Sequence, residues 1–115
     1  MKGVLRMSVK EELHRLIDKI NSNPVHIEHE KDRVFQINLD ESGILQMILE
    51  QGKITVTDGE EYEANVILWT SDKQFSKLLK DELNTTMAFM TGSLKVDGNL
   101  GLALKLQEIV KKYQS

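Results

Sequence analysis

The chain has 115 residues and a formal net charge of −3, and 40% of its residues are hydrophobic but only 5% aromatic. This length predicts a single domain over residues 1–115, and the acidic balance disfavours nucleic-acid binding, which needs a positive surface. Cysteine is absent, which excludes disulfides, thiolate metal sites and a thiol nucleophile.

An amphipathic helix opens the predicted domain. Ser8 and Glu11 stand at the two ends of a capping box, a pattern that starts helices. Apolar residues then recur at helical spacing and form one face: Val9, Leu13, Leu16, Ile17 and Ile20. Pro24 ends this helix. Residues 25–31 are compatible with a short helical turn that begins at Pro24 or with an extended segment, and residues 1–7 are expected to form a disordered lead.

Three segments with strand-like alternation follow. They cover residues 33–39, 44–50 and 53–57, and turn signals at Gly43 and Gly52 separate them. Consecutive strands joined by short turns predict an antiparallel meander. An acidic loop comes next along the chain.

The second half of the chain begins with a strand. Residues 64–70 are apolar on both faces, which predicts a strand flanked by other strands and covered on both sides. Ser71 and Gln74 then form a second capping box, which opens a helix with Phe75, Leu78 and Leu79 inward. Asn84 is a candidate cap for an apolar turn over residues 87–89.

The last quarter of the chain carries a short strand and a helix. Residues 94–96 alternate as a strand would, Asp97-Gly98 is expected to turn the chain, and Asn99 caps a helix that runs to about Tyr113. Together these elements predict an α+β layer architecture.

The closing helix is more apolar than one sheet contact requires. One stripe at helical spacing consists of Leu102, Leu106, Ile109, Val110 and Tyr113, and a second flank of Leu100, Ala103 and Leu104 lies beside it. Either the helix is deeply buried in the core or the surplus is covered by something else, such as a ligand or a partner.

No combination of residues in the chain indicates catalysis or metal binding. His26 and His29 share a helical face, but a third ligand at structural spacing is missing, so no metal site is expected. The carboxylates between Asp58 and Glu63 form a charge run that is expected to be solvated rather than catalytic. Neither a nucleophile elbow nor a phosphate-binding loop is present, and we expect no cofactor and no enzymatic activity.

A family resemblance is carried by the segment FMTGSLKVDGNLGLALKLQ, residues 89–107. It resembles the closing signature of the sterol carrier protein 2 family, a strand with G-x-L-K-x-x-G-N followed by a helix with G-L-A-x-K-L. A weaker resemblance over residues 64–75 extends the match to about residues 33–110. The resemblance implies a five-stranded, mostly antiparallel sheet covered by helices, with a hydrophobic tunnel between sheet and helices.

The same resemblance implies a set of lipid-binding residues along that tunnel. The expected lining residues are Phe35, Ile37, Leu45, Met47, Phe75, Leu79, Met87, Phe89, Met90, Leu102, Leu106 and Ile109. Many relatives carry glutamine where Met90 stands, so this pocket is expected to be more uniformly apolar.

The function that follows is non-enzymatic carriage of a long-chain lipid, with a fatty acid or acyl-CoA favoured over a sterol because the short chain is similar to bacterial members. The alternatives are a protein-interaction module that uses the same fold and, with less support, an acyl-CoA thioesterase-like enzyme. The longest apolar runs have four residues, so no stable membrane insertion is expected. We further expect a cytoplasmic protein that is a monomer or a weak dimer.

Overall fold

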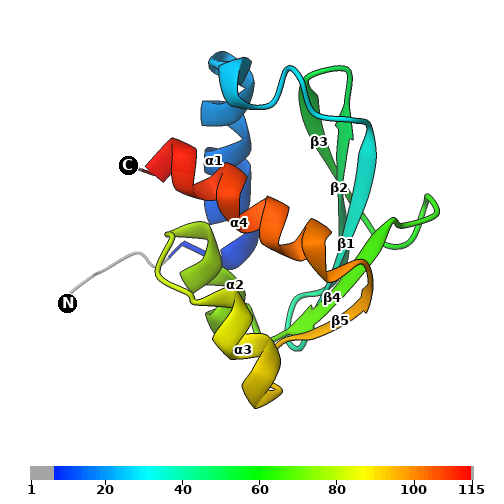
Figure 1. Ribbon diagram of the computed structural model, residues 1–115, viewed down its shortest axis with the longest axis vertical. Coiled ribbons are helices and arrows are strands. Elements are labelled where there is room, and N and C mark those ends of the chain that lie inside the picture. Colours follow the sequence, from blue (N-terminus) through cyan, green and yellow to red (C-terminus); the bar gives the residue numbers. More distant parts are fainter. Residues whose placement is uncertain (1–6, 115) are drawn as a thin grey trace.

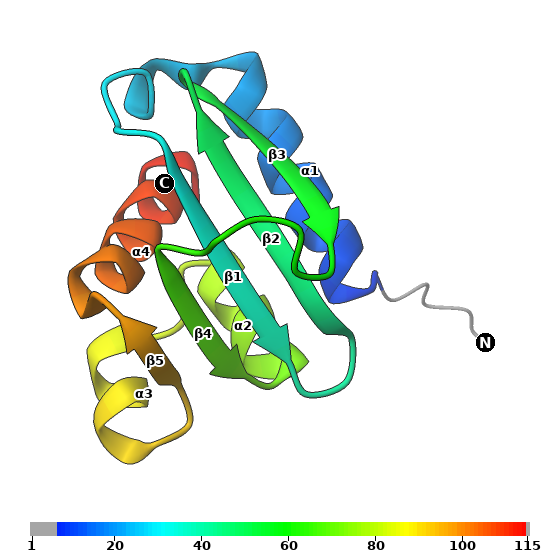
Figure 2. The ribbon, with the colours of Figure 1, turned by 90° about the vertical axis from the view of Figure 1, so that its right-hand side faces the viewer.

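The protein forms two layers, a sheet and a layer of helices. The computed structural model describes residues 7–114, and within this range a five-stranded sheet has the order β3-β2-β1-β4-β5. All the helices of this range lie on one face of the sheet (Figure 1), and the other face is free of helices (Figure 2). The expected α+β class, with a five-stranded and mostly antiparallel sheet covered by helices, is confirmed.

The elements follow the predicted order along the chain. They are α1 (Val9–Ser22), the 3-10 turn η1 (Pro24–His26), β1 (Arg33–Leu39), β2 (Gly43–Glu50), β3 (Lys53–Asp58), β4 (Val66–Thr70), α2 (Asp72–Leu79), α3 (Thr85–Thr91), β5 (Lys95–Gly98) and α4 (Leu100–Gln114). Residues 1–6 of the expected disordered lead lie outside the described range.

The sheet combines the predicted meander with one parallel pair. β1, β2 and β3 pair antiparallel in chain order, β4 joins β1 in parallel, and β5 closes the other edge antiparallel to β4. In this register Phe35 stands between Met47 and Val66 on the helix-facing side. The alternation read from the sequence therefore places one apolar row from each strand against the helices.

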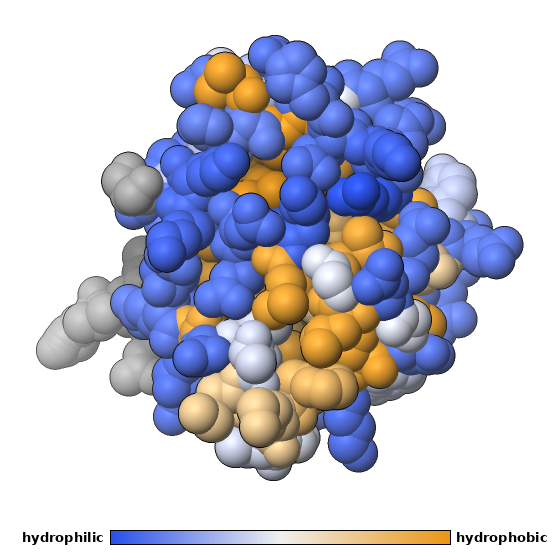
Figure 3. Space-filling view, in the orientation of Figure 1, coloured by the Kyte–Doolittle hydropathy of each residue, from blue (hydrophilic) through white to orange (hydrophobic). Residues whose placement is uncertain are grey.

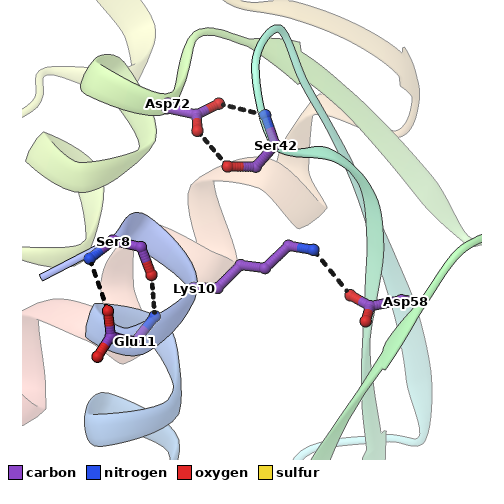
Figure 4. Close-up of polar contacts among 6 residues, drawn as sticks. All are labelled: Ser8, Lys10, Glu11, Ser42, Asp58 and Asp72. Atoms are coloured by element: carbon purple, nitrogen blue, oxygen red, sulfur yellow. Dashed lines mark hydrogen bonds and ion pairs between the residues drawn. The ribbon is translucent and has the colours of Figure 1, made fainter.

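α1 begins and ends as its sequence predicts. Both hydrogen bonds of the capping box are present, from the Ser8 N–H to Glu11 Oε1 at 3.0 Å and from the Glu11 N–H to Ser8 Oγ at 3.2 Å (Figure 4). Near the other end, the Asn21 side chain bonds both backbone groups of Ile54 on the edge strand β3, at 2.8 and 2.9 Å. This pairing occupies edge groups that would otherwise be open to another strand.

The segment after Pro24 takes the helical alternative. Pro24 begins the 3-10 turn η1, and the Tyr113 hydroxyl of α4 forms hydrogen bonds with the backbone of this segment. That hydroxyl donates to the Asn23 carbonyl at 2.7 Å and accepts from the His26 N–H at 3.2 Å. The His26 ring packs edge-on against Tyr113, so this histidine has a structural role.

Three local expectations need correction. β4 is not covered on both faces, because its outer face carries a half-buried Ile67 and an exposed Trp69. β5 runs to Gly98 rather than turning at Asp97-Gly98, because these residues pair with β4. Gly98 has φ +102°, and a Cβ there would lie 2.8 Å from the Asn65 carbonyl oxygen, so only glycine lets the strands approach here.

The third correction concerns the second capping box, which is only half formed. Ser71 Oγ accepts from the Gln74 N–H at 3.0 Å as predicted. Gln74 does not reach back to the cap, and its Oε1 is buried without a hydrogen-bond partner within residues 7–114.

Candidate functional site

Among the helices of residues 7–114, α3 carries the most exposed large apolar side chains. Asn84 Oδ1 caps it by accepting from the Met87 N–H at 3.0 Å, and Gly92 ends it in the left-handed conformation with φ +84°. The helix is longer than the turn that the sequence predicts. It buries only Thr85 and Ala88.

The outward side of α3 carries three large apolar side chains. Their exposed fractions are 56% for Met87, 39% for Phe89 and 75% for Met90. Side chains of this size are usually buried, and three of them on a seven-residue helix form a patch rather than a scatter.

The first turns of α4 extend this patch. Leu100 and Leu104, two members of the second flank predicted from the sequence, are half-buried, whereas Ala103 is fully buried. Figure 3 shows apolar residues gathered over α3 and the start of α4, beside a mostly hydrophilic surface elsewhere on this face. We call Met87, Phe89, Met90, Leu100 and Leu104 the α3–α4 apolar surface.

The twelve residues predicted to line a tunnel divide into three groups. Eight are buried in the core between the sheet and the helices: Phe35, Ile37, Leu45, Met47, Phe75, Leu79, Leu106 and Ile109. Leu102 is partly buried against this core. Met87, Phe89 and Met90 lie on the exposed side of α3.

A surface groove lies between α2 and α3, beside the exposed side chain of Met87. Its volume is about 250 Å³, and its lining residues are Gln74, Lys77, Glu82, Leu83, Asn84, Met87, Ala88, Thr91 and Ser93. We call it the α2–α3 groove. Except for Met87, its residues are absent from the set predicted from the sequence, because most of them are polar and become neighbours only when α3 folds back beside α2.

A second groove lies at one end of β4 and β5. It has a volume of about 550 Å³ and is lined by Asp40, Trp69, Thr70, Gly92, Ser93 and Lys95. We call it the β4–β5 groove. Ser93 lines both grooves, so the two meet at the segment that follows α3.

α3 is held less firmly than the other helices. It packs chiefly on α4, and the fully buried Thr85 hydroxyl beneath it has no hydrogen-bond partner within residues 7–114. A buried polar group without a partner costs roughly 1–3 kcal/mol. The low burial of α3 and this unpaired hydroxyl favour displacement of α3 over displacement of α1, α2 or α4.

The N-terminus of α2 is fixed to the turn between β1 and β2. Asp72 Oδ1 accepts from the N–H groups of Ser42 and Glu41 at 3.1 and 3.2 Å, and Asp72 Oδ2 accepts from the Ser42 hydroxyl (Figure 4). Burial raises the pKa of Asp72, but these hydrogen bonds outweigh it and leave the pKa below its ordinary value. The carboxylate is therefore a structural anchor, and α2 forms a fixed wall for the groove beside it.

The carboxylates of the acidic loop and the pair His26 and His29 were the only weak candidates for catalysis or metal binding in the sequence. None of these residues lines the α2–α3 groove or the β4–β5 groove. The acidic loop after β3 crosses the helix-free face of the sheet (Figure 2), where Glu60 accepts from Gln36 at 3.4 Å. Within residues 7–114 no group of three histidine or carboxylate side chains is placed to hold a metal ion.

The architecture is that of sterol carrier protein domains. The solution structure of the sterol carrier protein domain 2 of Helicoverpa armigera superposes with a TM-score of 0.72 at 19% identity, over 99% of this chain and 94% of that one. Sterol Carrier Protein-2 of Aedes aegypti, solved in complex with palmitate, gives 0.69 at 17% identity over 92% and 96%.

Residues 3–111 match the SCP-2 sterol transfer family, and the chain belongs to this family. Domains of this family bind lipids such as fatty acids. Hydroxysteroid dehydrogenase-like protein 2 of Xenopus tropicalis is 39% identical over 77 residues, which are 66% of this chain and 18% of that protein. The chain thus spans about a fifth of the length of the first curated relatives it matches. No helix within residues 7–114 is both long and apolar enough to cross a bilayer.

Proposed function

We propose that this domain binds a long-chain fatty acid or fatty acyl-CoA and carries it without catalysis. The observation that carries this proposal is the α3–α4 apolar surface. Three of its side chains are exposed on α3, which packs less extensively than the other helices. Membership of a lipid-binding family and the palmitate complex of the Aedes aegypti relative support the same ligand class.

The proposed path of the acyl chain begins in the α2–α3 groove. Phe75 and Leu79 are buried residues of α2. Ile37 and Met47 are buried on the helix-facing side of the sheet. Because these side chains are packed in a continuous core, the acyl chain reaches them only if α3 swings outward. Met87 and Met90 would then turn onto the ligand, a role that suits flexible methionine side chains.

Burial of an acyl chain would offset the cost of moving α3. Ten to fourteen buried methylenes contribute roughly 8–11 kcal/mol before ordering and desolvation costs, at about 0.8 kcal/mol each. Moving α3 exposes only Thr85 and Ala88 among the buried residues of that helix. The gross gain from burying an acyl chain is therefore set against a small loss of burial on α3 itself and the contacts that α3 makes with α4.

Calorimetric titration of delipidated protein with palmitate tests the proposal. We expect saturable binding, and we expect Met90→Glu to weaken it about tenfold because a carboxylate would face the acyl chain. Val25→Glu is the control, since Val25 is another exposed apolar residue, 48% exposed, but lies in η1. Absence of saturable binding, or equal effects of the two substitutions, would contradict the proposed acyl site.

A second candidate function rests on the same exposed side chains. The α3–α4 apolar surface would instead pack against a protein partner, a role that suits a domain whose curated relatives are several times longer. Sedimentation of the delipidated protein distinguishes the two readings. A compact monomer that binds palmitate supports lipid carriage, whereas self-association that palmitate does not reverse supports the interaction surface.

A further inference from the structure

β5 (Lys95–Gly98) forms an edge of the sheet whose outward backbone groups are open to another strand. β4 is its one neighbour in the sheet (Figure 2), so alternate residues of β5 direct their N–H and C=O groups away from β4. Within residues 7–114, β5 forms no backbone–backbone hydrogen bond beyond this pairing. An edge of this kind is a template for the addition of a strand.

The opposite edge of the sheet is occupied by α1. The Asn21 side chain bonds both backbone groups of Ile54 on β3, at 2.8 and 2.9 Å, and Lys10 pairs with Asp58 at the end of β3, at 3.1 Å. Addition of a strand to β3 would have to break these contacts. Pairing through sheet edges is therefore confined to β5, and two copies that both use β5 form a closed two-fold dimer rather than a filament.

The charges of β5 are ordered so that the strand is complementary to itself. Lys95 and Asp97 stand opposite Trp69 and Ile67 of β4 and are exposed on the outer face of the sheet. Within residues 7–114 neither charged side chain takes part in an ion pair. In an antiparallel pairing centred on Val96, Lys95 of each copy lies opposite Asp97 of the other, which forms two cross-strand pairs of opposite charge.

The neighbouring registers are disfavoured by charge. Centring the pairing on Lys95 or on Asp97 puts like charges directly opposite each other, as does a parallel pairing in register. The register centred on Val96 also places the two half-buried Val96 side chains together on the helix-facing side. In this register the helix layers of both copies lie on the same face, and the sheet continues across the two-fold axis.

We propose that β5 pairs with β5 of a second copy of this chain, in the antiparallel register centred on Val96. This inference goes beyond the proposed function, because none of the residues that carry it lies on α3 or α4. The strand has only four residues, so the dimer is weak, with a dissociation constant of about 0.1–1 mM. At micromolar concentration the chain is then a monomer, so the pairing does not interfere with sedimentation as a test of the α3–α4 apolar surface.

Translational diffusion, measured by NMR over a concentration series up to about 1 mM, tests the pairing. We expect the diffusion of the wild type to slow as its concentration rises, with saturable shifts of the amide signals of residues 94–98. Lys95→Asp would put carboxylates opposite each other at both cross-strand positions, and Asp97→Lys would do the same with ammonium groups. Each substitution should therefore weaken the association about tenfold.

A mixture of the two variants tests the register itself. Lys95→Asp carries only carboxylates on β5 and Asp97→Lys carries only ammonium groups, so a dimer of one with the other regains two pairs of opposite charge. ¹⁵N-labelled Lys95→Asp should diffuse more slowly, and its signals at residues 94–98 should shift, when unlabelled Asp97→Lys is added. Addition of unlabelled Lys95→Asp should have neither effect.

Matched controls make the same charge changes away from β5. Lys73→Asp on α2 and Asp18→Lys on α1 are at exposed positions, and neither should weaken the association. Their mixture should associate no more tightly than the wild type, which separates the pairing from general attraction between oppositely charged proteins.

Three results would overturn the proposal. The first is diffusion of the wild type as a monomer up to about 1 mM. The second is association that Lys95→Asp leaves unchanged, because another surface such as the α3–α4 apolar surface would then carry it. The third is failure of the mixed variants to restore association. The palmitate titration is independent of all three results, so failure of this proposal and failure of the proposed function can be told apart.

Discussion

The side chain of Gln46 holds the backbone of Tyr62 on the outer face of the sheet. Gln46 Nε2 donates to the Tyr62 carbonyl at 2.7 Å, and Gln46 Oε1 accepts from the Tyr62 N–H at 3.0 Å and from the Glu61 N–H at 3.2 Å. Gln46 also donates to Gln36, its direct cross-strand neighbour, at 3.0 Å. This network covers the centre of a sheet face that no helix of the described residues covers.

Replacement of Gln46 should therefore destabilise the protein from its outer face. Gln46→Leu would leave Gln36 Oε1 buried without this donor and release the loop, and we expect a loss of about 1–3 kcal/mol in the free energy of unfolding. Urea unfolding measures it, with Thr55→Val at an exposed site of the same face as the control. A loss no larger than that of the control would show that the network does not stabilise the fold.

The acid stability of the protein should depend on Asp72. Its lowered pKa means that its contribution is complete above the pKa of an unfolded aspartate, about 3.9, and is lost as the pH falls through the lower folded value. Asp72→Asn should be less stable than wild type at pH 7, and the difference should shrink below about pH 4. Urea unfolding across pH measures both curves.

The pKa of Glu11 is also lowered, and this residue provides the comparison for Asp72. The Ser8 N–H lowers the pKa of Glu11, followed by the Ser8 hydroxyl. We therefore expect the stability of Asp72→Asn to keep an acid dependence that is smaller in the double variant with Glu11→Gln. A constant difference between wild type and Asp72→Asn across this range would contradict the assigned role of Asp72.

Two phenylalanines from the predicted lining set should behave oppositely. Phe75 is fully buried, and Phe75→Ala should reduce the free energy of unfolding by about 3–5 kcal/mol. Phe89 is 39% exposed, and Phe89→Ala should change stability by less than about 1 kcal/mol while weakening palmitate binding. Thermal unfolding and calorimetric titration of both variants check this, and a stable Phe89→Ala variant with unchanged palmitate affinity would remove Phe89 from the site.

Local sequence signals predict most of the fold. The capping box at Ser8 and the alternation in the first three strands are short-range patterns, and the structure confirms them. The prediction that β4 is covered on both faces is wrong, because Trp69 is apolar yet lies on a face that no helix within residues 7–114 covers. The pattern of a strand does not reveal on which side the rest of the chain will pack.

The candidate site is less predictable than the fold for a related reason. The four consecutive apolar residues 87–90 have no polar face, so their pattern cannot show that Ala88 points inward and Met90 outward. The grooves bring together polar residues from distant segments, such as Asp40 and Lys95, that carry no shared motif. Only the sheet order, with β1 beside β4 and β5 beyond it, makes them neighbours.

Methyl NMR of the methionines tests the central claim that an acyl chain enters between the helices and the sheet. The chain has five methionines, among which Met87 and Met90 lie on α3, Met47 lies in the core and Met7 is exposed ahead of α1. On addition of palmitate to delipidated protein, we expect saturable shifts at Met87, Met90 and Met47. Shifts confined to Met87 and Met90, or none at all, would contradict the account.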